Sequence, residues 1–488
     1  MTGRPSMTGG GETGAEEPRP APARHRIGWA ALRGVAVGVW GLGVEGEANI
    51  RRLAALGVTP VLVDDRPGGG GVGAQHRVTG PVLATAEGGL EALAECEVVV
   101  KTPGVSRYRP EGGELEATGI PVVGGLGLWM EEADRDRVVC VTGSKGKSTT
   151  AAVAGHLLER LGYRCLVGGN IGRPPWDPEA GEGYDYWVVE TSSFQATDLA
   201  VSPSVVAVTS LSPDHLDWHG DVATYYRDKL SVCTQPGAGV TVAVGDDPIL
   251  AAHAALLGRR VRWIRPGDRS VDGPWLDGLG LLGRHNHRNA LVARACLMAL
   301  EVPEATDDEA VGRAAADFHR LPSRLQPLGA VDGVVFVDDS LSTNVLPTLA
   351  ALEAFAGRRV AVLVGGHDRG VDYGSLADGL VGRSAPTLVL TLPASGPRIH
   401  RAIDAVLETA AGVGTTPAAI EVVDCDDLAT ATRRGFDWAG PGGVVLLSPA
   451  APSFGQFRDY ADRAAAFAEA MRACGPVGPE PVGPGSDH

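Results

Sequence analysis

Lysine is nearly absent from this 488-residue chain, because only four of its 43 basic residues are lysines. Arginine keeps its charge under ordinary conditions, whereas the amine of lysine can lose its proton and can be chemically modified. In a chain that places arginine at nearly every other basic position, each lysine is a candidate for chemistry that arginine cannot perform. The four are Lys101, Lys145, Lys147 and Lys229.

Cysteines and long apolar runs are also scarce. The seven cysteines show neither CxxC nor Cys/His spacing, which indicates reduced thiols rather than disulfides or a zinc site. The lack of a long apolar run and of a basic-apolar leader predicts a cytoplasmic protein that does not enter a membrane. A net charge of −16 disfavours nucleic-acid binding, so an anionic substrate would need local positive charges or a metal ion.

Apolar, strand-like runs alternate with helix-like stretches along the chain, without an internal repeat, and this pattern predicts α/β architecture. The length allows about three domains of ordinary size. Both ends are rich in Gly, Pro, Ala and Glu and lack apolar periodicity, which predicts flexible segments. The expected divisions are a flexible extension over 1–26, domains over 27–136, 137–323 and 324–474, and a flexible tail over 475–488.

The segment VTGSKGKSTT, residues 141–150, lies between a predicted buried strand and a predicted helix. Its glycines allow a tight turn in which backbone N–H groups face an anion at the helix start. Lys147 would then reach the outer phosphates of a nucleotide, and the Ser148 hydroxyl would hold Mg²⁺. This segment therefore predicts a nucleotide-binding site.

The spacing of this loop departs from the full GxxxxGK[ST] pattern, because Val141 stands five positions before Gly146. A chance glycine turn is the alternative to a phosphate loop. A solvated loop charge explains Lys145 as well as a ligand contact does.

A second glycine-rich turn, WGLGVEG, carries GxGxxG at Gly41, Gly43 and Gly46 between a predicted strand and a predicted helix. Asp64 and Asp65 follow at the end of the next strand, at about the spacing of a ribose-binding acid. Taken alone, this pattern indicates a dinucleotide oxidoreductase. It also fits any nucleotide diphosphate bound over a helix N-terminus, and GxGxxG alone is weak evidence.

Polar clusters follow three further apolar stretches, namely VGGNIG, WVVETSSFQ and TSLSPDHLDWHG. Ligands bind outside the carboxyl ends of parallel strands, so Asn170, Glu190 and His215 are expected to converge near the phosphate loop. For each residue alone, a local cap or turn hydrogen bond is the alternative.

The two remaining lysines lie away from the phosphate loop in sequence. Lys101 ends a predicted strand that enters a Pro-Gly turn, where a plain strand-ending turn and a ligand loop are equally open. Lys229 lies in a predicted helix over 224–232, where an ordinary exposed charge is the alternative. The scarcity of lysine argues against that alternative.

The third segment begins near Arg324 and repeats the pattern of an apolar strand followed by a polar loop. GVVFVDDS, LVGGHDRGVDY and VVLLSPAAPSFGQF are its strand and loop sequences. They predict a second nucleotide-type α/β unit, which could close over the middle domain and exclude water from phosphoryl chemistry.

These motifs, in this order, resemble the Mur ligases of peptidoglycan precursor synthesis, over residues 35–467. The resemblance is carried by WGLGVEG, KTPGVS, TGSKGKSTT, GGNIG, ETSSFQ, DHLDWHG, YYRDK, GRHNHRNA, DDSLSTN, GGHDRG and LSPAAPS. It implies a Rossmann-like N-terminal domain that binds UDP, a central P-loop ATPase-like domain with a parallel sheet, and a Rossmann-like C-terminal domain. It also implies a monomer.

The resemblance implies ATP-driven amide formation that adds glutamate to UDP-N-acetylmuramoyl-L-alanine through an acyl phosphate. Phosphoryl transfer of this kind depends mostly on positioning and charge stabilisation. The implied catalytic residues are Lys147, Glu190, His215 and Lys229. By similarity, Ser148 and Glu190 would hold one Mg²⁺, while His215 and Lys229 would serve a second ion, with Lys229 as a carbamate that offers an oxygen ligand.

The family's binding positions map onto further residues of this chain. Those for ATP are Gly143, Ser144, Lys145, Gly146, Lys147, Ser148, Thr149, Asn286, Asn289, Arg324 and Asp339. Those for the UDP substrate are Gly41, Gly43, Val44, Glu45, Arg66, Asn170, Ser192 and Gln195. Those for glutamate are Thr343, Arg369 and Ser453.

Three positions depart from the usual D-glutamate-adding enzymes. Leu341 replaces the lysine of the family's DSKATN motif, Ser323 replaces a histidine, and Arg369 replaces a lysine. With WGxGxEG, KTPGVSRYRPE and DWHG, these departures favour a divergent subfamily that adds L-glutamate and works with an epimerase acting on the product. A D-glutamate-adding enzyme is the alternative, because handedness depends on small differences in one pocket.

Three other functions compete with this interpretation. A nicotinamide oxidoreductase would explain GxGxxG but leaves the second phosphate loop unexplained. A folylpolyglutamate synthase-like ligase would share the central loop and the lysine carbamate but lacks the UDP-type first domain. A non-catalytic nucleotide-binding relative is disfavoured by the presence of Lys147, Glu190, His215 and Lys229.

Overall fold

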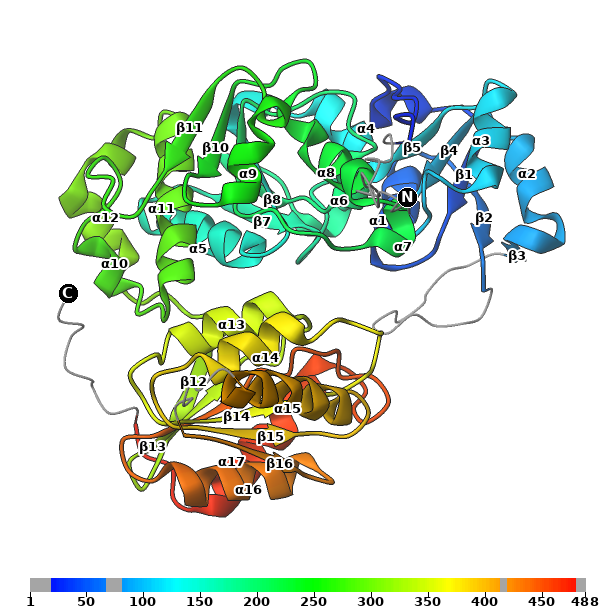
Figure 1. Ribbon diagram of the computed structural model, residues 1–488. Helices are drawn as coiled ribbons and strands as arrows, with labels where there is room; N and C mark the ends of the chain where they lie inside the picture. Colours follow the sequence, from blue (N-terminus) through cyan, green and yellow to red (C-terminus); the bar gives the residue numbers. More distant parts are fainter. Residues whose placement is uncertain (1–18, 67–80, 413–418, 480–488) are drawn as a thin grey trace, which may run out of the picture. The chain divides into compact units, whose positions relative to one another are not determined.

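The computed structural model describes residues 19–66, 81–412 and 419–479, in which helices flank three β-sheets (Figure 1). The chain forms two compact units. The first runs to Gly273 and includes Arg288–Ala314, and the second consists of Pro274–His287 and the chain from Ala315 onward. The predicted α/β class is confirmed, with two sheets in the first unit and one in the second.

The N-terminal sheet has the strand order β3-β2-β1-β4-β5, and all its strands are parallel. Ligands bind at the point where the strand order reverses, which here lies between β1 and β4. The strands are β1 (Val37–Trp40), β2 (Val61–Asp64), β3 (Val82–Ala84), β4 (Val98–Lys101) and β5 (Val122–Gly124). The helices are α1 (Val44–Ala55), α2 (Leu90–Ala94), α3 (Pro110–Ala117) and α4 (Gly125–Glu132).

The central sheet has the order β11-β10-β9-β6-β8-β7 and is also parallel throughout. Every residue of β6 and β9 is buried, which explains their valine-rich sequences. The strands are β6 (Val138–Thr142), β7 (Cys165–Gly169), β8 (Tyr186–Glu190), β9 (Val205–Val208), β10 (Val240–Val244) and β11 (Val261–Ile264).

The helices that follow these strands place several motif residues at helix ends. They are α5 (Lys147–Arg160), α6 (Ser193–Ala196), α7 (Leu216–His219), α8 (Val222–Leu230), α9 (Pro248–Ala252), α10 (Trp275–Gly278), α11 (Arg284–Ala299) and α12 (Asp308–Ala315). The strand order reverses between β6 and β9, so the loops after these two strands frame a second switch point.

The C-terminal sheet has the order β12-β13-β17-β14-β15-β16, with β12 antiparallel at one edge and the other strands parallel. Its strands are β12 (Gln326–Val331), β13 (Val334–Asp338), β14 (Val360–Val364), β15 (Thr387–Thr391), β16 (Ile420–Asp424) and β17 (Val444–Leu447). Its helices are α13 (Val345–Glu353), α14 (Gly374–Val381), α15 (Gly396–Gly412), α16 (Leu428–Ala439) and α17 (Tyr460–Cys474).

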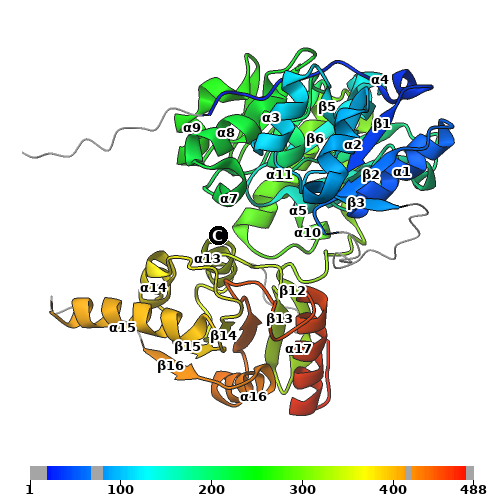
Figure 2. The ribbon, with the colours of Figure 1, turned by 90° about the vertical axis from the view of Figure 1, so that its right-hand side faces the viewer.

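The two faces of the C-terminal sheet bury separate apolar cores. Successive residues of β13 alternate between them, because Val335 and Val337 pack with α13, α14 and α15, whereas Val334 and Phe336 pack with α16 and α17. Figure 2 shows these two helical layers on opposite sides of the sheet. The carboxyl ends of its strands are thereby left to the polar loops.

The predicted flexible ends lie partly outside the described residues, which exclude 1–18 and 480–488. The described part of the extension makes defined contacts, since Arg19 N donates to Thr224 Oγ1 at 2.9 Å and Arg26 Nε to Glu131 at 3.0 Å. In the tail, Gly478 forms an antiparallel bridge with Ala330. The domain limits and the flexibility of both ends stay predictions.

All seven cysteines lie within the described residues and are unpaired. Among the helices of the described part of the chain, none combines the length and apolar character that crossing a membrane requires.

Candidate functional site

The phosphate loop sits between β6 and α5, and its turn depends on Gly146. This residue has φ +93°, and a Cβ there would lie 2.5 Å from Asn289 Oδ1, so a side chain would be both strained and obstructed. The loop that follows β9 fixes this turn through hydrogen bonds to its backbone. Ser144 N donates to Ser210 O at 2.9 Å, and Lys145 N donates to Ser210 Oγ at 2.8 Å.

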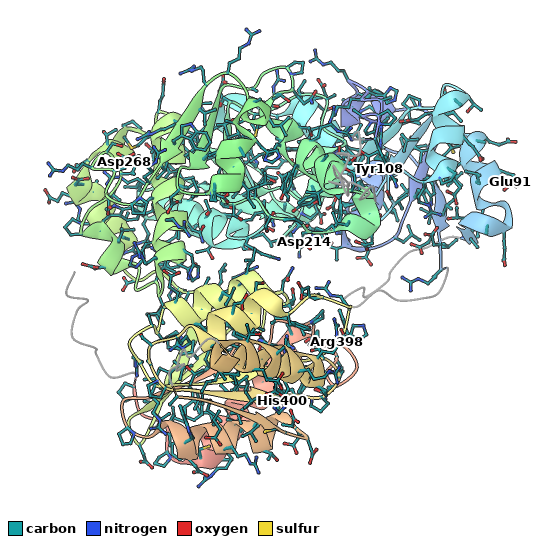
Figure 3. All side chains as sticks on the ribbon, viewed as in Figure 1. Glu91, Tyr108, Asp214, Asp268, Arg398 and His400 are labelled. Carbon is teal, nitrogen blue, oxygen red and sulfur yellow. The ribbon has the colours of Figure 1, made fainter. Side chains whose placement is uncertain are left out.

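The two lysines of this loop point to different partners. Lys147 Nζ donates to the Gly143 carbonyl oxygen at 3.0 Å, so the amine lies over its own loop. Lys145 Nζ lies 3.1 Å from a carboxylate oxygen of Asp214, the residue labelled in Figure 3. The phosphate contact of Lys147 stays a prediction, whereas Lys145 is held in an ion pair.

Ser148, Glu190 and Asn170 come together at the carboxyl ends of the central strands. Ser148 Oγ donates to Glu190 Oε2 at 2.6 Å, and Asn170 Nδ2 donates to Glu190 Oε1 at 2.8 Å. Ser148 and Glu190 are buried. The structure thus brings together three residues that the sequence placed at separate strand ends.

The oxygen atoms of Ser148 and Glu190 fit a magnesium ion. Mg²⁺ prefers hard oxygen ligands and binds through one or two carboxylates together with substrate phosphates. In the described ranges, no cluster of three or more His, Cys, Asp or Glu residues could hold a metal by itself. A divalent ion here would therefore draw its other ligands from a nucleotide and water.

Lys229 is fully buried in α8, and its Nζ donates to the Gly143 carbonyl oxygen at 3.1 Å. The same carbonyl accepts the hydrogen bond of Lys147. Burial, followed by the positive charge of Lys147, lowers the pKa of Lys229 well below its usual value. The alternative that Lys229 is an ordinary exposed charge is therefore wrong. Its surroundings favour the neutral amine.

His215 stands at the start of α7 in a left-handed conformation, with φ 52°. Its side chain is half exposed, and Nε2 lies 3.9 Å from Asp214. Burial lowers the pKa of His215 and outweighs the opposing effect of Asp214. A neutral imidazole is the form that can bind a metal ion.

The GxGxxG turn of the first unit is built for close backbone approach. Gly41 has φ +93°, and a Cβ there would lie 2.1 Å from Thr102 Oγ1 in the loop after β4. Leu42 N donates to Asp64 Oδ2 at 2.8 Å, and Arg66 N donates to Asp64 Oδ1 at 2.9 Å. Asp64 Oδ2 therefore holds the turn, while Oδ1 holds the loop that follows β2.

Glu45, in the first turn of α1, joins this turn to the central domain. Gln195 Nε2 donates to Glu45 Oε1 at 2.6 Å. Burial raises the pKa of Glu45 to about 8, against the opposing effect of that hydrogen bond. Gly43 and Val44, beside it, are exposed.

Ser192 is the N-cap residue of α6. Its hydroxyl oxygen accepts from Gln195 N at 3.1 Å, and Gln195 Oε1 accepts from Ser192 N at 2.9 Å. This reciprocal capping box fixes the Gln195 side chain, whose amide nitrogen then reaches Glu45. The capping role leaves the predicted substrate role of these residues untested.

The remaining predicted ATP residues divide between the two units. Asn286 belongs to the second unit and Asn289 to the first, and both are buried on α11. Asn286 Nδ2 donates to Leu282 O at 2.9 Å. Thr149, in the first turn of α5, is also buried.

Asp339 and Arg324 lie in the second unit, at the carboxyl end of β13. Asp339 accepts hydrogen bonds from Leu325 N at 3.0 Å and from Ser448 Oγ at 2.8 Å. Burial raises the pKa of Asp339 to about 7. Arg324 is flanked by Ser323 and Leu325, both with positive φ, so its backbone position is tightly constrained.

The predicted glutamate residues come from loops after β13, β14 and β17. Arg369, which is exposed, donates from Nη2 to Thr343 O at 3.0 Å. Ser453 is buried, and its carbonyl accepts from Phe457 N at 3.1 Å. A Cβ at Gly366 would lie 2.4 Å from Pro452 O, so the last two loops touch.

Two of the three departures from the family pattern are direct neighbours. Leu341 N donates to Ser323 O at 3.1 Å. Ser323 Oγ donates to Asp338 Oδ2 at 2.8 Å. The two positions at which the sequence predicts a departure therefore lie in one local patch beside Asp339.

A polar network in the first unit, with Ser193, His219 and Asp228 buried and Tyr108 half-buried, was not predicted from the sequence. Tyr108, Ser193, His219 and Asp228 are joined by side-chain hydrogen bonds across four segments. Ser193, His219 and Asp228 lie in motifs of the family resemblance and Tyr108 lies just after KTPGVS, but no local pattern indicated that they meet. Lys101, which the sequence left open, is buried in an ion pair with Asp198 at 2.7 Å.

Known families and relatives match this chain along most of its length. The Mur ligase middle domain matches residues 141–270, and the Mur ligase glutamate ligase domain matches residues 323–451. The UDP-N-acetylmuramoyl-L-alanine--L-glutamate ligase of Xanthomonas axonopodis pv. citri (strain 306) is 40% identical over 472 residues, covering 90% of this chain and 95% of that protein. The protein of the same name from Micromonospora sp. is 41% identical over 460 residues, covering 90% of this chain and 97% of that protein.

Solved structures show the same fold at low identity. The UDP-N-acetylmuramate-alanine ligase of Thermotoga maritima aligns with a TM-score of 0.52 at 18% identity, over 90% of this chain and all of that one. The MurF ligase of Thermotoga maritima, in complex with ADP, aligns with a TM-score of 0.50 at 15% identity, over 93% of this chain and 98% of that one. Since both matched domains and the 40–41% identical relatives agree with the resemblance seen in the motifs, the chain belongs to the Mur ligase family.

Proposed function

We propose that this protein is an ATP-dependent ligase that adds glutamate to UDP-N-acetylmuramoyl-L-alanine in peptidoglycan precursor synthesis. The observation that carries the proposal is the identity of 40–41%, over nine-tenths of the chain, with relatives named for this reaction. The site geometry supports it, because Lys147, Glu190 and Lys229 lie around one phosphate loop.

In this reaction the alanyl carboxylate of the UDP substrate attacks the γ-phosphorus of ATP, and ADP leaves. The amine of glutamate then attacks the acyl carbon, and inorganic phosphate leaves as the amide forms. Lys147 would lie against the transferring phosphoryl group, and the backbone amides of the loop would hold the neighbouring phosphates. These groups supply the positioning and positive charge that such a transfer requires.

Bound Mg²⁺ would neutralise the charge that develops on the phosphate oxygens. Ser148 and Glu190 would hold one such ion, and Asn170 keeps the Glu190 carboxylate oriented through its 2.8 Å hydrogen bond. His215 and Lys229 would serve a second ion.

Lys229 would serve that ion as a carbamate. Its amine lies buried on the Gly143 carbonyl, in surroundings that disfavour the charged form. Carbon dioxide adds to the neutral amine, a proton is released, and an anionic oxygen donor is created for the hard cation. Arginine, which stays protonated, could not replace lysine here.

We further propose that the amino acid is L-glutamate. The support comes from Leu341 and Ser323, which together remove two basic side chains from one patch beside Asp339, and from the names of the relatives. An epimerase would then act on the product. We expect a monomer that works in the cytoplasm, where ATP and the nucleotide substrate are available.

To test this, purified protein is incubated with UDP-N-acetylmuramoyl-L-alanine, ATP and Mg²⁺, and each glutamate enantiomer is added in a separate reaction. Phosphate release and product mass are recorded. We expect product with L-glutamate. Turnover with D-glutamate alone would reject the stereochemical proposal and keep the ligase, whereas no product with either enantiomer would reject the proposed function.

A further inference from the structure

A chain of buried side chains crosses the first unit without any role in the chemistry described above. His219 is fully buried at the end of α7. Its Nδ1 lies 2.8 Å from Asp228 Oδ2, and its Nε2 lies 2.9 Å from Ser193 Oγ. The ring therefore bridges α8, where Asp228 precedes Lys229, and α6, where Ser193 follows the cap residue Ser192.

The direction of these two hydrogen bonds follows from chemistry. A carboxylate accepts only, so Nδ1–H donates to Asp228. When the ring carries one proton, Nε2 accepts the Ser193 hydroxyl proton. The ring thus satisfies a donor and an acceptor at once, and no other uncharged side chain offers both at this spacing on a rigid plane.

The ring is also fixed in place by aromatic neighbours. Phe194 stacks on it with centroids 5.6 Å apart, and Tyr225 meets it edge-on at 5.2 Å. The Tyr225 hydroxyl in turn lies 3.0 Å from Ser144 Oγ in the phosphate loop. His219 consequently cannot turn without disturbing α6, α8 and that loop.

The same network reaches the N-terminal domain at two places. Tyr108 OH, labelled in Figure 3, donates to Asp228 Oδ2 at 2.7 Å. On the other side, Gln195 of α6 donates to Glu45 of α1 at 2.6 Å. The helix that carries Lys229 and the turn that carries GxGxxG are therefore linked through α6 and α7.

We propose that His219 is a positioning residue that holds α6 and α8 at a set separation, so that the alanyl carboxylate of the UDP substrate meets the phosphoryl group beside Lys229. This inference rests on the proposed function. Because reacting atoms must approach to within about 3–3.5 Å, a small shift of α6 relative to α8 reduces productive encounters strongly. His219 itself contacts no substrate.

Three substitutions separate the two bonds of the ring. The amide nitrogen of His219→Asn overlaps Nδ1 and keeps the bond to Asp228, while the bond to Ser193 is lost. Ser193→Ala removes the same bond from its other end. His219→Gln reaches toward Ser193 instead and gives up the bond to Asp228. His253, which packs on Tyr226 in α8 at 4.8 Å and lies outside the network, provides the matched control His253→Asn.

The measurement is kcat and KM for each substrate, together with calorimetric binding of UDP-N-acetylmuramoyl-L-alanine in the absence of ATP. For His219→Asn and Ser193→Ala we expect KM and Kd for the UDP substrate to rise about tenfold, with KM for ATP changed less than about twofold. His219→Gln should mainly lower kcat, because the α8 side is released. His253→Asn should match the wild type.

Two outcomes would overturn the inference while the wild type remains active. One is an unchanged KM and kcat in all three network variants. The other is an equal loss for every substrate that follows a fall in thermal stability, which would assign His219 a purely structural role. If the wild type neither turns over nor binds the UDP substrate, the proposed function fails, and the inference fails with it.

Discussion

The four lysines of the chain have four distinct environments. Lys147 and Lys229 both donate to the Gly143 carbonyl, whereas Lys101 and Lys145 form ion pairs with Asp198 and Asp214. The single nitrogen of a lysine side chain reaches each of these acceptors at one point, whereas the planar fork of arginine presents five donors in a wider, fixed arrangement. Of the four lysines that scarcity singled out, Lys147 and Lys229 therefore meet at the phosphate loop, and the other two form ion pairs.

Replacement of Lys229 by alanine should reduce turnover about 100-fold, because the proposed carbamate oxygen is lost from the site. Acetate or propionate should restore part of the activity by filling the space with another carboxylate. The measurement is phosphate release against carboxylate concentration. Lys229→Arg, which keeps a positive charge and fills the space, serves as the control and should respond to neither compound. An active arginine variant, or no response of the alanine variant, would count against the carbamate.

Glu45 should make the protein less stable as the pH rises. Its pKa is about 8 in the folded protein, against an ordinary value of 4.5, so the folded state binds the proton more tightly than the unfolded chain. Its contribution is therefore present below pH 4.5 and is lost as the pH approaches 8.

Glu45→Gln keeps an acceptor for Gln195 and removes this titration. The free energy of unfolding of the variant, from urea titrations at several pH values, should exceed that of the wild type by roughly 1–2 kcal/mol at the alkaline end. The difference should shrink toward acid pH. A difference that does not vary with pH would show that Glu45 titrates normally.

The first turn of helix α5 contributes residues to the site, and the glycines before and after this helix are required for different reasons. Gly146 precedes the helix at φ +93° and faces Asn289, whereas Gly162 follows it at φ +99° with open space around it. The backbone demand is the same at both ends. At Gly146 alone, a side chain would also collide with a neighbour, Asn289, at the point where a phosphate would bind.

Gly146→Ala should therefore cost more than Gly162→Ala. We expect about 1 kcal/mol for Gly162→Ala, from the left-handed conformation alone, and about 2–3 kcal/mol for Gly146→Ala. Calorimetry should find ATP binding lost only in Gly146→Ala. Equal effects of the two substitutions on stability and on ATP affinity would mean that the contact with Asn289 is readily relieved.

At the scale of the molecule, the parallel sheets were predictable because strands buried on both faces require continuous apolar runs, as in β6 and β9. The meeting of Asn170 and Glu190 beside the phosphate loop followed from a different rule, that ligands bind outside the carboxyl ends of parallel strands. The contact of Tyr108 with Asp228, 120 residues away, was not predictable, since no periodicity or turn pattern records it. The capping box of Ser192 lay within the sequence pattern itself, but its link to Glu45 did not.

In the proposed reaction, an acyl phosphate forms on the alanyl carboxylate of the UDP substrate. Isotope transfer tests it most directly: with ¹⁸O in that carboxylate, the released phosphate is examined by mass spectrometry after a complete reaction with ATP and L-glutamate. We expect one ¹⁸O atom in each phosphate released, and none when the label is in glutamate instead. Unlabelled phosphate from the labelled UDP substrate, or phosphate release that needs no UDP substrate, would contradict it.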